Sequence, residues 1–160
     1  GDVEVMATPL DFVGINYYIR EVIRSKDAHA RQEIFPAKER TEMGWEVYPD
    51  GLFEILTRVH ADYPFERLYV TENGAAFVDQ VGPGNVVDDP RRVAYLQGYV
   101  DAAARAIEAG VPLHGYFVWS LMDNFEWGHG FSKRFGLIYV DYRTQERIVK
   151  ASGRWYGDRR

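Results

Sequence analysis

The stretch LYVTENGAAF, residues 68–77, decides what kind of fold this chain can form. Its first residues are apolar β-formers, and we predict a buried strand over residues 67–72. The strand ends on the carboxylate of Glu72, after which Asn73 and Gly74 supply turn chemistry. A carboxylate at the end of a buried strand needs a partner or a function, because burying a lone charge is costly.

Helix and strand patterns alternate on both sides of this stretch. Apolar residues recur at helical spacing over residues 49–60 and again over 90–109, where Asp89 is the predicted helix cap. The other predicted elements are strands at 10–17 and 113–120, a loop at 79–89, a strand or hairpin arm at 135–142, a terminal helix at 151–160 and a polar, irregular segment at 20–48.

The order strand, helix, strand, helix, strand, with continuous apolar strands, is typical of a parallel sheet covered on both faces. The predicted fold class is therefore α/β. In parallel α/β folds the carboxyl ends of the strands lie on one side of the sheet, and the loops there usually carry function.

Composition excludes several classes of partner. The net charge is −5 and the pI about 5.4, so the chain lacks the positive face that nucleic-acid binding needs. No apolar run approaches the length of a membrane span, and the N-terminus has no signal-like apolar core. We therefore expect a cytoplasmic protein that binds neither nucleic acid nor membrane. The chain does not open on Met, and we expect it to be a piece of a longer protein.

The sequence does not favour a metal site, a catalytic thiol or a serine nucleophile. There is no cysteine, and the histidines have no spacing that would place two ligands on one helical face. Ser120 and Ser132 lack the G-x-S-x-G context of a nucleophile elbow. We expect no metal and no cofactor.

Polar and aromatic residues lie at the end of each predicted strand. The first ends around Asn16 and Tyr18, the second at Glu72 and the third around Trp119, with Glu126 shortly beyond. A lone Glu72 would most simply pair with an arginine. Two carboxylates among aromatic rings instead suit sugar chemistry, because rings stack on pyranose faces and a carboxylate can attack the anomeric carbon. Spacing alone indicates Glu72 and Glu126 as the catalytic pair.

Three segments together resemble glycoside hydrolase family 1, the β-glucosidases and β-galactosidases built on a (β/α)8 TIM barrel. They are DFVGINYY at 11–18, YVTENGAAF at 69–77 and GYFVWSLMDNFEWGHGFSKRFGLIYVDY at 115–142. The resemblance covers nearly the whole chain. It implies that residues 1–160 are the C-terminal part of a single barrel domain and supply about strands 6–8 with their helices.

The resemblance also implies catalytic roles. Glu72, in T-E-N-G, matches the nucleophile of the family. Tyr18 matches a tyrosine that hydrogen-bonds the nucleophile, and Asn16 matches a residue that contacts the nucleophile and the reacting sugar. Glu126 becomes a sugar-binding residue, which revises the pair indicated by spacing.

Further matches concern the sugar itself. Trp119 matches the platform under the glycone ring, and Glu126 and Trp127 match residues that bind the glycone hydroxyls far from the anomeric carbon. Phe135 matches a residue that lines the same end. Trp45 matches an aromatic residue beside the leaving-group site. Because Glu126 would repel a phosphate, we expect unphosphorylated β-glucosides as substrates, with β-galactosides or β-fucosides as side substrates.

The acid/base of the family is a Glu in a T-x-N-E-P motif, and no N-E-P occurs in this chain. We therefore predict a retaining β-glycosidase whose acid/base comes from a missing N-terminal part. Three strands of eight leave open sheet edges, so we also expect either a complementing barrel segment or self-association. Two alternatives without turnover stay open, namely a fragment that binds sugar and a fragment that only self-associates. A transglycosylase and a thioglycosidase are the open alternatives among enzymes.

Overall fold

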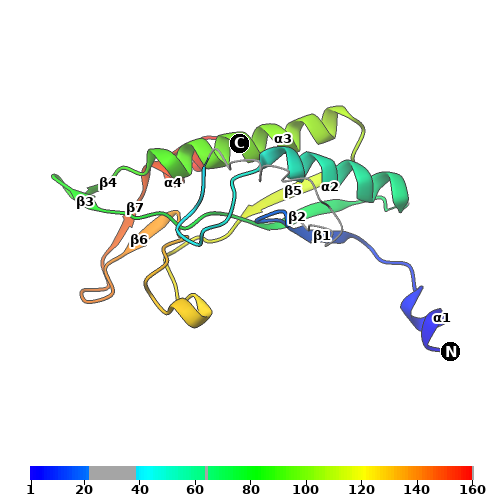
Figure 1. Ribbon diagram of the computed structural model, residues 1–160, viewed down its shortest axis with the longest axis horizontal. Coiled ribbons are helices and arrows are strands. Elements are labelled where there is room, and N and C mark those ends of the chain that lie inside the picture. The colour runs from blue at the N-terminus through cyan, green and yellow to red at the C-terminus, as the bar shows by residue number, and fades with distance from the viewer. Residues whose placement is uncertain (22–38, 64, 160) are drawn as a thin grey trace, which may run out of the picture.

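The computed structural model describes residues 1–21, 39–63 and 65–159. Most of the segment predicted to be irregular, residues 20–48, lies outside this range, as does Arg160 at the end of the predicted terminal helix. The described elements build one three-stranded sheet, two small hairpins and the helices around them (Figure 1).

The sheet is parallel and has the strand order β1-β2-β5. Its strands are β1, Val13–Asn16, β2, Leu68–Asn73, and β5, Leu113–Val118. All three coincide with predicted strands, although β1 and β5 are shorter than expected. The central strand β2 is the one that carries Glu72, so the two other strand ends lie on either side of this carboxylate.

Two helices connect the strands and lie over one face of the sheet (Figure 1). They are α2, Pro49–Asp62, and α3, Pro90–Glu108, and each begins with a proline whose fixed φ suits the first helical turn. Gly110, at φ +95, follows α3 and turns the chain toward β5. Both helices confirm the predicted helical spacing.

The remaining elements are short. They are α1, Asp2–Met6, the hairpin β3, Val81–Gly82, with β4, Val86–Val87, the 3-10 helix η1, Trp127–His129, the hairpin β6, Ile138–Val140, with β7, Arg147–Val149, and α4, Ala151–Gly157. The β3–β4 hairpin replaces the predicted loop at 79–89. Its turn places Gly84 and Asn85 at positive φ, which these two residue types tolerate best.

Only one face of the sheet is covered, so the prediction of a sheet covered on both faces was wrong for the described part of the chain. Leu68 and Val70 of β2 are fully buried beneath the helices together with Leu56 of α2 and Leu96 of α3. On the opposite face, Phe117 of β5 is more than half exposed, and its ring centroid lies 6.4 Å from that of Tyr69. In complete parallel α/β folds both faces of the sheet are covered, so the bare face is unusual for a parallel sheet.

Asp89 precedes α3 as predicted, but its side chain makes no capping bond to that helix. It accepts hydrogen bonds from the backbone N–H and the hydroxyl of Ser152, at the start of α4, and from the Arg92 guanidinium. The predicted cap therefore serves a different helix, because tertiary packing brings the N-terminus of α4 against it.

The buried tyrosines between α3 and the sheet make the protein sensitive to alkali. Burial raises the pKa of Tyr99 to about 12, and its hydroxyl accepts the Tyr48 N–H at 3.0 Å. The folded state therefore keeps a proton that the unfolded state loses near pH 10, and stability falls as pH rises from about 10 to 12. We expect Tyr99→Phe to make this fall shallower by up to about 1.4 kcal/mol per pH unit.

Denaturant unfolding between pH 9 and 11.5 checks this expectation. Tyr63→Phe, at an exposed position after α2, is the matched control and should leave the pH dependence unchanged. If the free energy of unfolding fell equally steeply with pH in Tyr99→Phe and in the parent protein, Tyr99 would not be a source of the alkali sensitivity.

Candidate active site

The ends of β1, β2 and β5 are tied together by backbone hydrogen bonds. The Tyr17 N–H donates to the Glu72 carbonyl at 2.9 Å, and the Trp119 N–H donates to the Asn73 carbonyl at 2.9 Å. The predicted convergence of three strand ends is therefore present in the structure. Side chains that project from these three strand ends on the bare face of the sheet therefore lie on one surface.

Glu72 is held by Tyr18 on this surface. The Tyr18 hydroxyl donates to Glu72 Oε2 at 2.9 Å, across 54 residues of sequence. Burial raises the pKa of Tyr18 well above its usual range, and the hydrogen bond to Glu72 and the charges of Glu72 and Glu126 act in the same direction. Tyr18 is consequently a protonated donor at neutral pH that fixes one oxygen of the carboxylate.

Asn16 is held in a similar way by its neighbour on β2. The Thr71 hydroxyl donates to Asn16 Oδ1 at 2.7 Å. Gly14 makes room for this contact, because a Cβ at that position would lie 2.8 Å from Thr71 Cγ2. This bond fixes the orientation of the amide, so its NH2 group points away from Thr71.

Three aromatic rings form a wall beside Glu72. The Trp45 ring centroid lies 5.4 Å from that of Tyr18 and 6.1 Å from that of Phe135, and Tyr18 and Phe135 are 6.4 Å apart. Phe135 is only 3% exposed. The structure thus places Trp45 and Phe135 side by side, whereas the resemblance assigned them to different ends of the sugar. Phe135 is the buried member of the wall.

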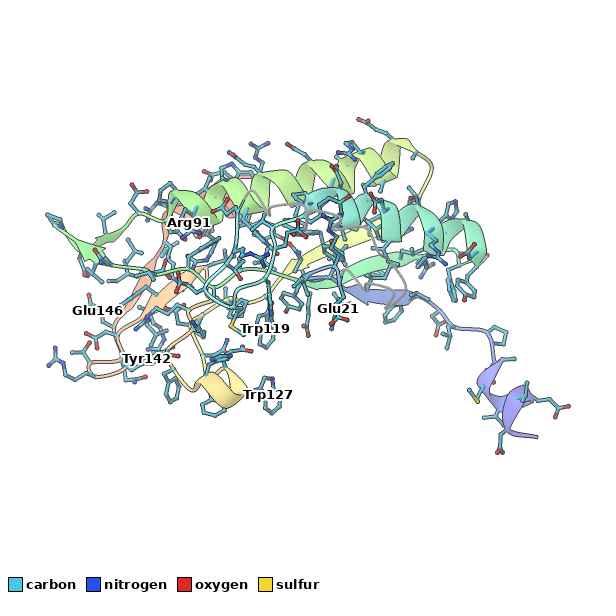
Figure 2. All side chains as sticks on the ribbon, in the orientation of Figure 1. Glu21, Arg91, Trp119, Trp127, Tyr142 and Glu146 are labelled. Atoms are coloured by element: carbon cyan, nitrogen blue, oxygen red, sulfur yellow. The ribbon has the colours of Figure 1, made fainter. Side chains whose placement is uncertain are left out.

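The loop after β5 carries the other predicted site residues (Figure 2). Trp119 follows β5 directly and is partly buried, whereas Trp127 is 84% exposed and projects from η1 below the sheet. Glu126 precedes η1, and its backbone N–H donates to the Gly130 carbonyl at 2.7 Å. Besides burial, the charge of Glu126 makes a small contribution to the raised pKa of Tyr18, whereas Trp127 is exposed and lies outside the packed part of the site.

A buried ion cluster anchors this loop, and sequence reasoning missed it. Lys150 donates to Asp79 at 2.6 Å and to Asp123 at 2.8 Å, and all three side chains are fully buried. Arg92 pairs with Asp79 at 2.9 Å, and Arg134 pairs with Asp123 at 2.6 Å. The partners are far apart in sequence, so no local pattern could have revealed these pairs.

Asp123 connects the cluster to the segment that holds Phe135. Its Oδ1 accepts the Gly136 N–H at 2.9 Å. Gly136 has no space for a side chain, because a Cβ there would lie 2.1 Å from the Asp123 backbone nitrogen. Burial lowers the pKa of Lys150, and the charges of Asp79 and Asp123 oppose that effect. The loop that carries Trp119 and Glu126 is therefore held in place by ion pairs that are buried away from water.

Gly74 explains why a glycine follows the Glu72–Asn73 pair. A Cβ at Gly74 would lie 1.8 Å from the carbonyl oxygen of Trp119. We expect Gly74→Ala to push the Trp119 backbone away, to destabilise the protein by about 1–3 kcal/mol, and to weaken binding of any ligand that rests on Trp119. Thermal unfolding and ligand titration check both effects.

Gly157→Ala is the control, since a Cβ there meets no atom within 4 Å. It should leave both the melting temperature and ligand affinity close to those of the parent. A Gly74→Ala variant as stable as the parent would show that the Trp119 backbone yields without cost.

Two findings concern chemistry outside this site. In the described part of the chain, no group of three or more acidic or histidine side chains could hold a metal ion. Over the same residues, no helix is both long enough and apolar enough to cross a membrane.

The fold and the site together define a class of protein. It is a parallel α/β protein in which a tyrosine-bound carboxylate and aromatic rings share the strand ends, an arrangement suited to a pyranose ring. The sequence model of glycosyl hydrolase family 1 matches residues 1–159, and the chain belongs to this family.

Individual relatives agree with this assignment. The chain is 48% identical to β-glucosidase A of Thermotoga maritima over 98% of its own length, and 42% identical to a 6-phospho-β-galactosidase of Lacticaseibacillus rhamnosus over 93%. It superposes on a solved β-glucosidase of Thermotoga maritima in complex with azafagomine with a TM-score of 0.89 and 45% identity, covering 98% of this chain. The chain spans only 36–37% of the length of these relatives.

Proposed function

We propose that this chain is the nucleophile-bearing part of a retaining β-glycosidase, that it supplies about strands 6–8 of the barrel, and that it acts on unphosphorylated β-glucosides. Glu72 is the nucleophile and Tyr18 its hydrogen-bond donor. Asn16, Trp119, Glu126 and Trp127 bind the sugar, and Trp45 and Phe135 form the aromatic wall.

One observation carries this proposal. Glu72 leaves the end of the central strand on the bare face, and the Tyr18 hydroxyl fixes its Oε2 at 2.9 Å. Its other oxygen is then the one that can face an anomeric carbon. Membership of glycosyl hydrolase family 1 supports the same reaction class.

The proposed reaction has two steps. Glu72 attacks the anomeric carbon, the bond to the leaving oxygen breaks, and a glycosyl-enzyme ester forms while an acid/base carboxylic acid protonates the leaving group. In the second step the acid/base group, now a carboxylate, takes a proton from water. The water oxygen attacks the anomeric carbon and displaces Glu72. Retaining chemistry places the two carboxyl groups about 5–5.5 Å apart.

The acid/base belongs to the part of the barrel that this chain does not cover. The bare face supports this view, because Phe12 and Phe117 are more than half exposed on the open side of the sheet. Both outer strands, β1 and β5, also have an unpaired edge among the described elements. A complementing N-terminal barrel segment would cover this face and pair these edges.

A chimera tests the proposal. Residues 1–160 replace the matching segment of Thermotoga maritima β-glucosidase A, and the product is treated with a 2-deoxy-2-fluoro-β-glucoside that traps the glycosyl-enzyme. We expect hydrolysis of an aryl β-glucoside and one label on the peptide that contains Glu72. A label on any other residue would refute the assignment of the nucleophile.

Glu126 makes a prediction about the substrate. A carboxylate next to the glycone would repel a 6-phosphate, since like charges in a closed site are costly. We expect kcat/KM of the chimera to be at least about a hundredfold higher for an aryl β-glucoside than for its 6-phosphate, equivalent to roughly 2.7 kcal/mol. Glu126→Ser should narrow the ratio, and a preference for the phosphorylated substrate would refute this part of the proposal.

The bare sheet favours a second candidate for the chain by itself. Exposed parallel edges are templates for pairing with another chain, so the isolated chain would bind sugar without turnover or simply self-associate. Size-exclusion chromatography over a range of concentrations, with glucose titration of each species, separates these outcomes. A monomeric and cooperatively folding isolated chain would contradict the need for a complementing segment.

A further inference from the structure

The direction of Glu72 depends on one extra residue in β2. Along this strand, Leu68 and Val70 are buried beneath the helices, and strict alternation would place Glu72 on that same side. Instead Thr71 and Glu72 are both partly exposed, and Asn73 is fully buried. The alternation of faces therefore slips by one residue just before the carboxylate.

The register of both neighbouring strands shows the same slip. On the β1 side, Ile15 pairs with Val70 but the next residue, Asn16, pairs with Glu72. On the β5 side, Val70 pairs with Tyr116 and Asn73 with Val118, so three steps on β2 match two on β5. An extra residue of this kind is a β-bulge, which re-aims a side chain and interrupts the ladder of hydrogen bonds.

The side chain of Asn73 supplies bonds where the ladder is interrupted. Its Nδ2 donates to the Tyr17 carbonyl at 2.7 Å and to the Tyr95 hydroxyl at 3.0 Å, and its Oδ1 accepts from the Tyr116 hydroxyl. These partners come from the end of β1, from α3 and from β5. A single buried amide thus holds the end of β2 to both neighbouring strands and to the helix layer.

The bond to Tyr17 is the one that reaches the reacting groups. Both backbone polar groups of Tyr17 are held by β2, because its N–H donates to the Glu72 carbonyl and its carbonyl accepts from Asn73. Tyr18 follows directly and donates to the Glu72 carboxylate. Moving the Tyr17 carbonyl would therefore move the hydroxyl that orients the nucleophile.

We propose that Asn73 is a positioning residue that holds the β2 bulge and thereby aims Glu72 at the sugar and keeps Tyr18 against it. The inference rests on the proposed function of Glu72. Its structural part, that Asn73 sets the direction of the Glu72 side chain, stands independently of any activity.

The test uses the chimera described above and the variants Asn73→Ala and Tyr116→Phe. We expect Asn73→Ala to slow formation of the trapped 2-fluoroglucosyl-enzyme at least tenfold per active site, with glucose affinity changed less than threefold. Tyr116→Phe removes one of the three bonds and should slow trapping less than Asn73→Ala. In a crystal structure of Asn73→Ala, Glu72 and Tyr18 should no longer be within hydrogen-bond distance.

Leu56→Ala is the matched control, because Leu56 is fully buried in α2 and belongs to the helix side of the core. It should lower the melting temperature and keep the trapping rate. If Asn73→Ala does not fold, Asn73→Asp decides the matter, because it keeps the Oδ1 acceptor for Tyr116 and removes the Nδ2 donor to Tyr17. An unchanged trapping rate and an unchanged Glu72–Tyr18 distance in that variant overturn the inference.

Failure of the inference and failure of the proposed function give different results. Trapping of the parent chimera at Glu72, with an unchanged rate and distance in Asn73→Ala, overturns the role of Asn73 alone. Labelling of the parent at another residue overturns the proposed nucleophile, and the crystallographic distance then still tests whether Asn73 aims Glu72.

Discussion

We expect Glu72→Gln in the chimera to lower kcat/KM for an aryl β-glucoside at least about a thousandfold, equivalent to roughly 4 kcal/mol of lost transition-state stabilisation. The amide has nearly the shape of the carboxylate and can still contact Tyr18, so the fold and the binding of glucose are retained. What is lost is the nucleophile, because an amide oxygen attacks an anomeric carbon far more weakly. Steady-state kinetics and thermal unfolding of the same preparation measure both parts.

A smaller side chain sharpens this result. Glu72→Gly leaves space for an external anion, and added azide should then restore turnover of a reactive aryl glucoside and give the α-glucosyl azide. Glu108→Gln, at the exposed end of α3, is the control and should leave kcat/KM unchanged. Activity of Glu72→Gln within tenfold of the parent would contradict a nucleophilic role.

We expect Lys150→Met to destabilise the protein by about 3–5 kcal/mol, the usual cost of removing one partner from a buried ion pair. The ammonium group lies between Asp79 at 2.6 Å and Asp123 at 2.8 Å, with no exposure of any of the three side chains. Methionine fills the space but leaves two carboxylates with fewer partners in a region that excludes water. Urea unfolding followed by tryptophan fluorescence measures the loss.

Arg58→Met provides the comparison on the surface. Arg58 pairs with Asp62 at 3.4 Å on the exposed side of α2, where removing the charge should cost no more than about 1 kcal/mol. If Lys150→Met cost no more than Arg58→Met, the cluster would not be what anchors the loop after β5.

Local patterns were enough to predict most of the sheet and its helices. Pro49 and Pro90 mark the two helix starts, and the apolar runs mark three strands, because periodicity and cap chemistry act over a few neighbouring residues. The β3–β4 hairpin and the bare face of the sheet were not predicted. Both depend on which segments pair or pack together, and hydrophobicity along the chain does not carry that information.

The site shows the same division. The sequence indicated a carboxylate at a strand end with polar and aromatic residues at two others, and the structure brings Tyr18 into contact with Glu72. It did not indicate the ion cluster around Lys150 or the separate positions of Trp127 and Phe135. Lys150 and Asp79 are 71 residues apart, so their pairing follows from the folded chain alone.

The sequence by itself indicated a carboxylate near the end of a buried strand, since Glu72 lies two residues after the apolar run 68–70 and directly precedes Asn73 and Gly74. The tertiary structure decided which way that carboxylate points. An extra residue of β2 exists only relative to the strands beside it, and the Asn73 amide that bridges it takes its partners from β1, α3 and β5. Where a strand forms depends on neighbouring residues in the sequence, whereas its register depends on pairing between distant segments.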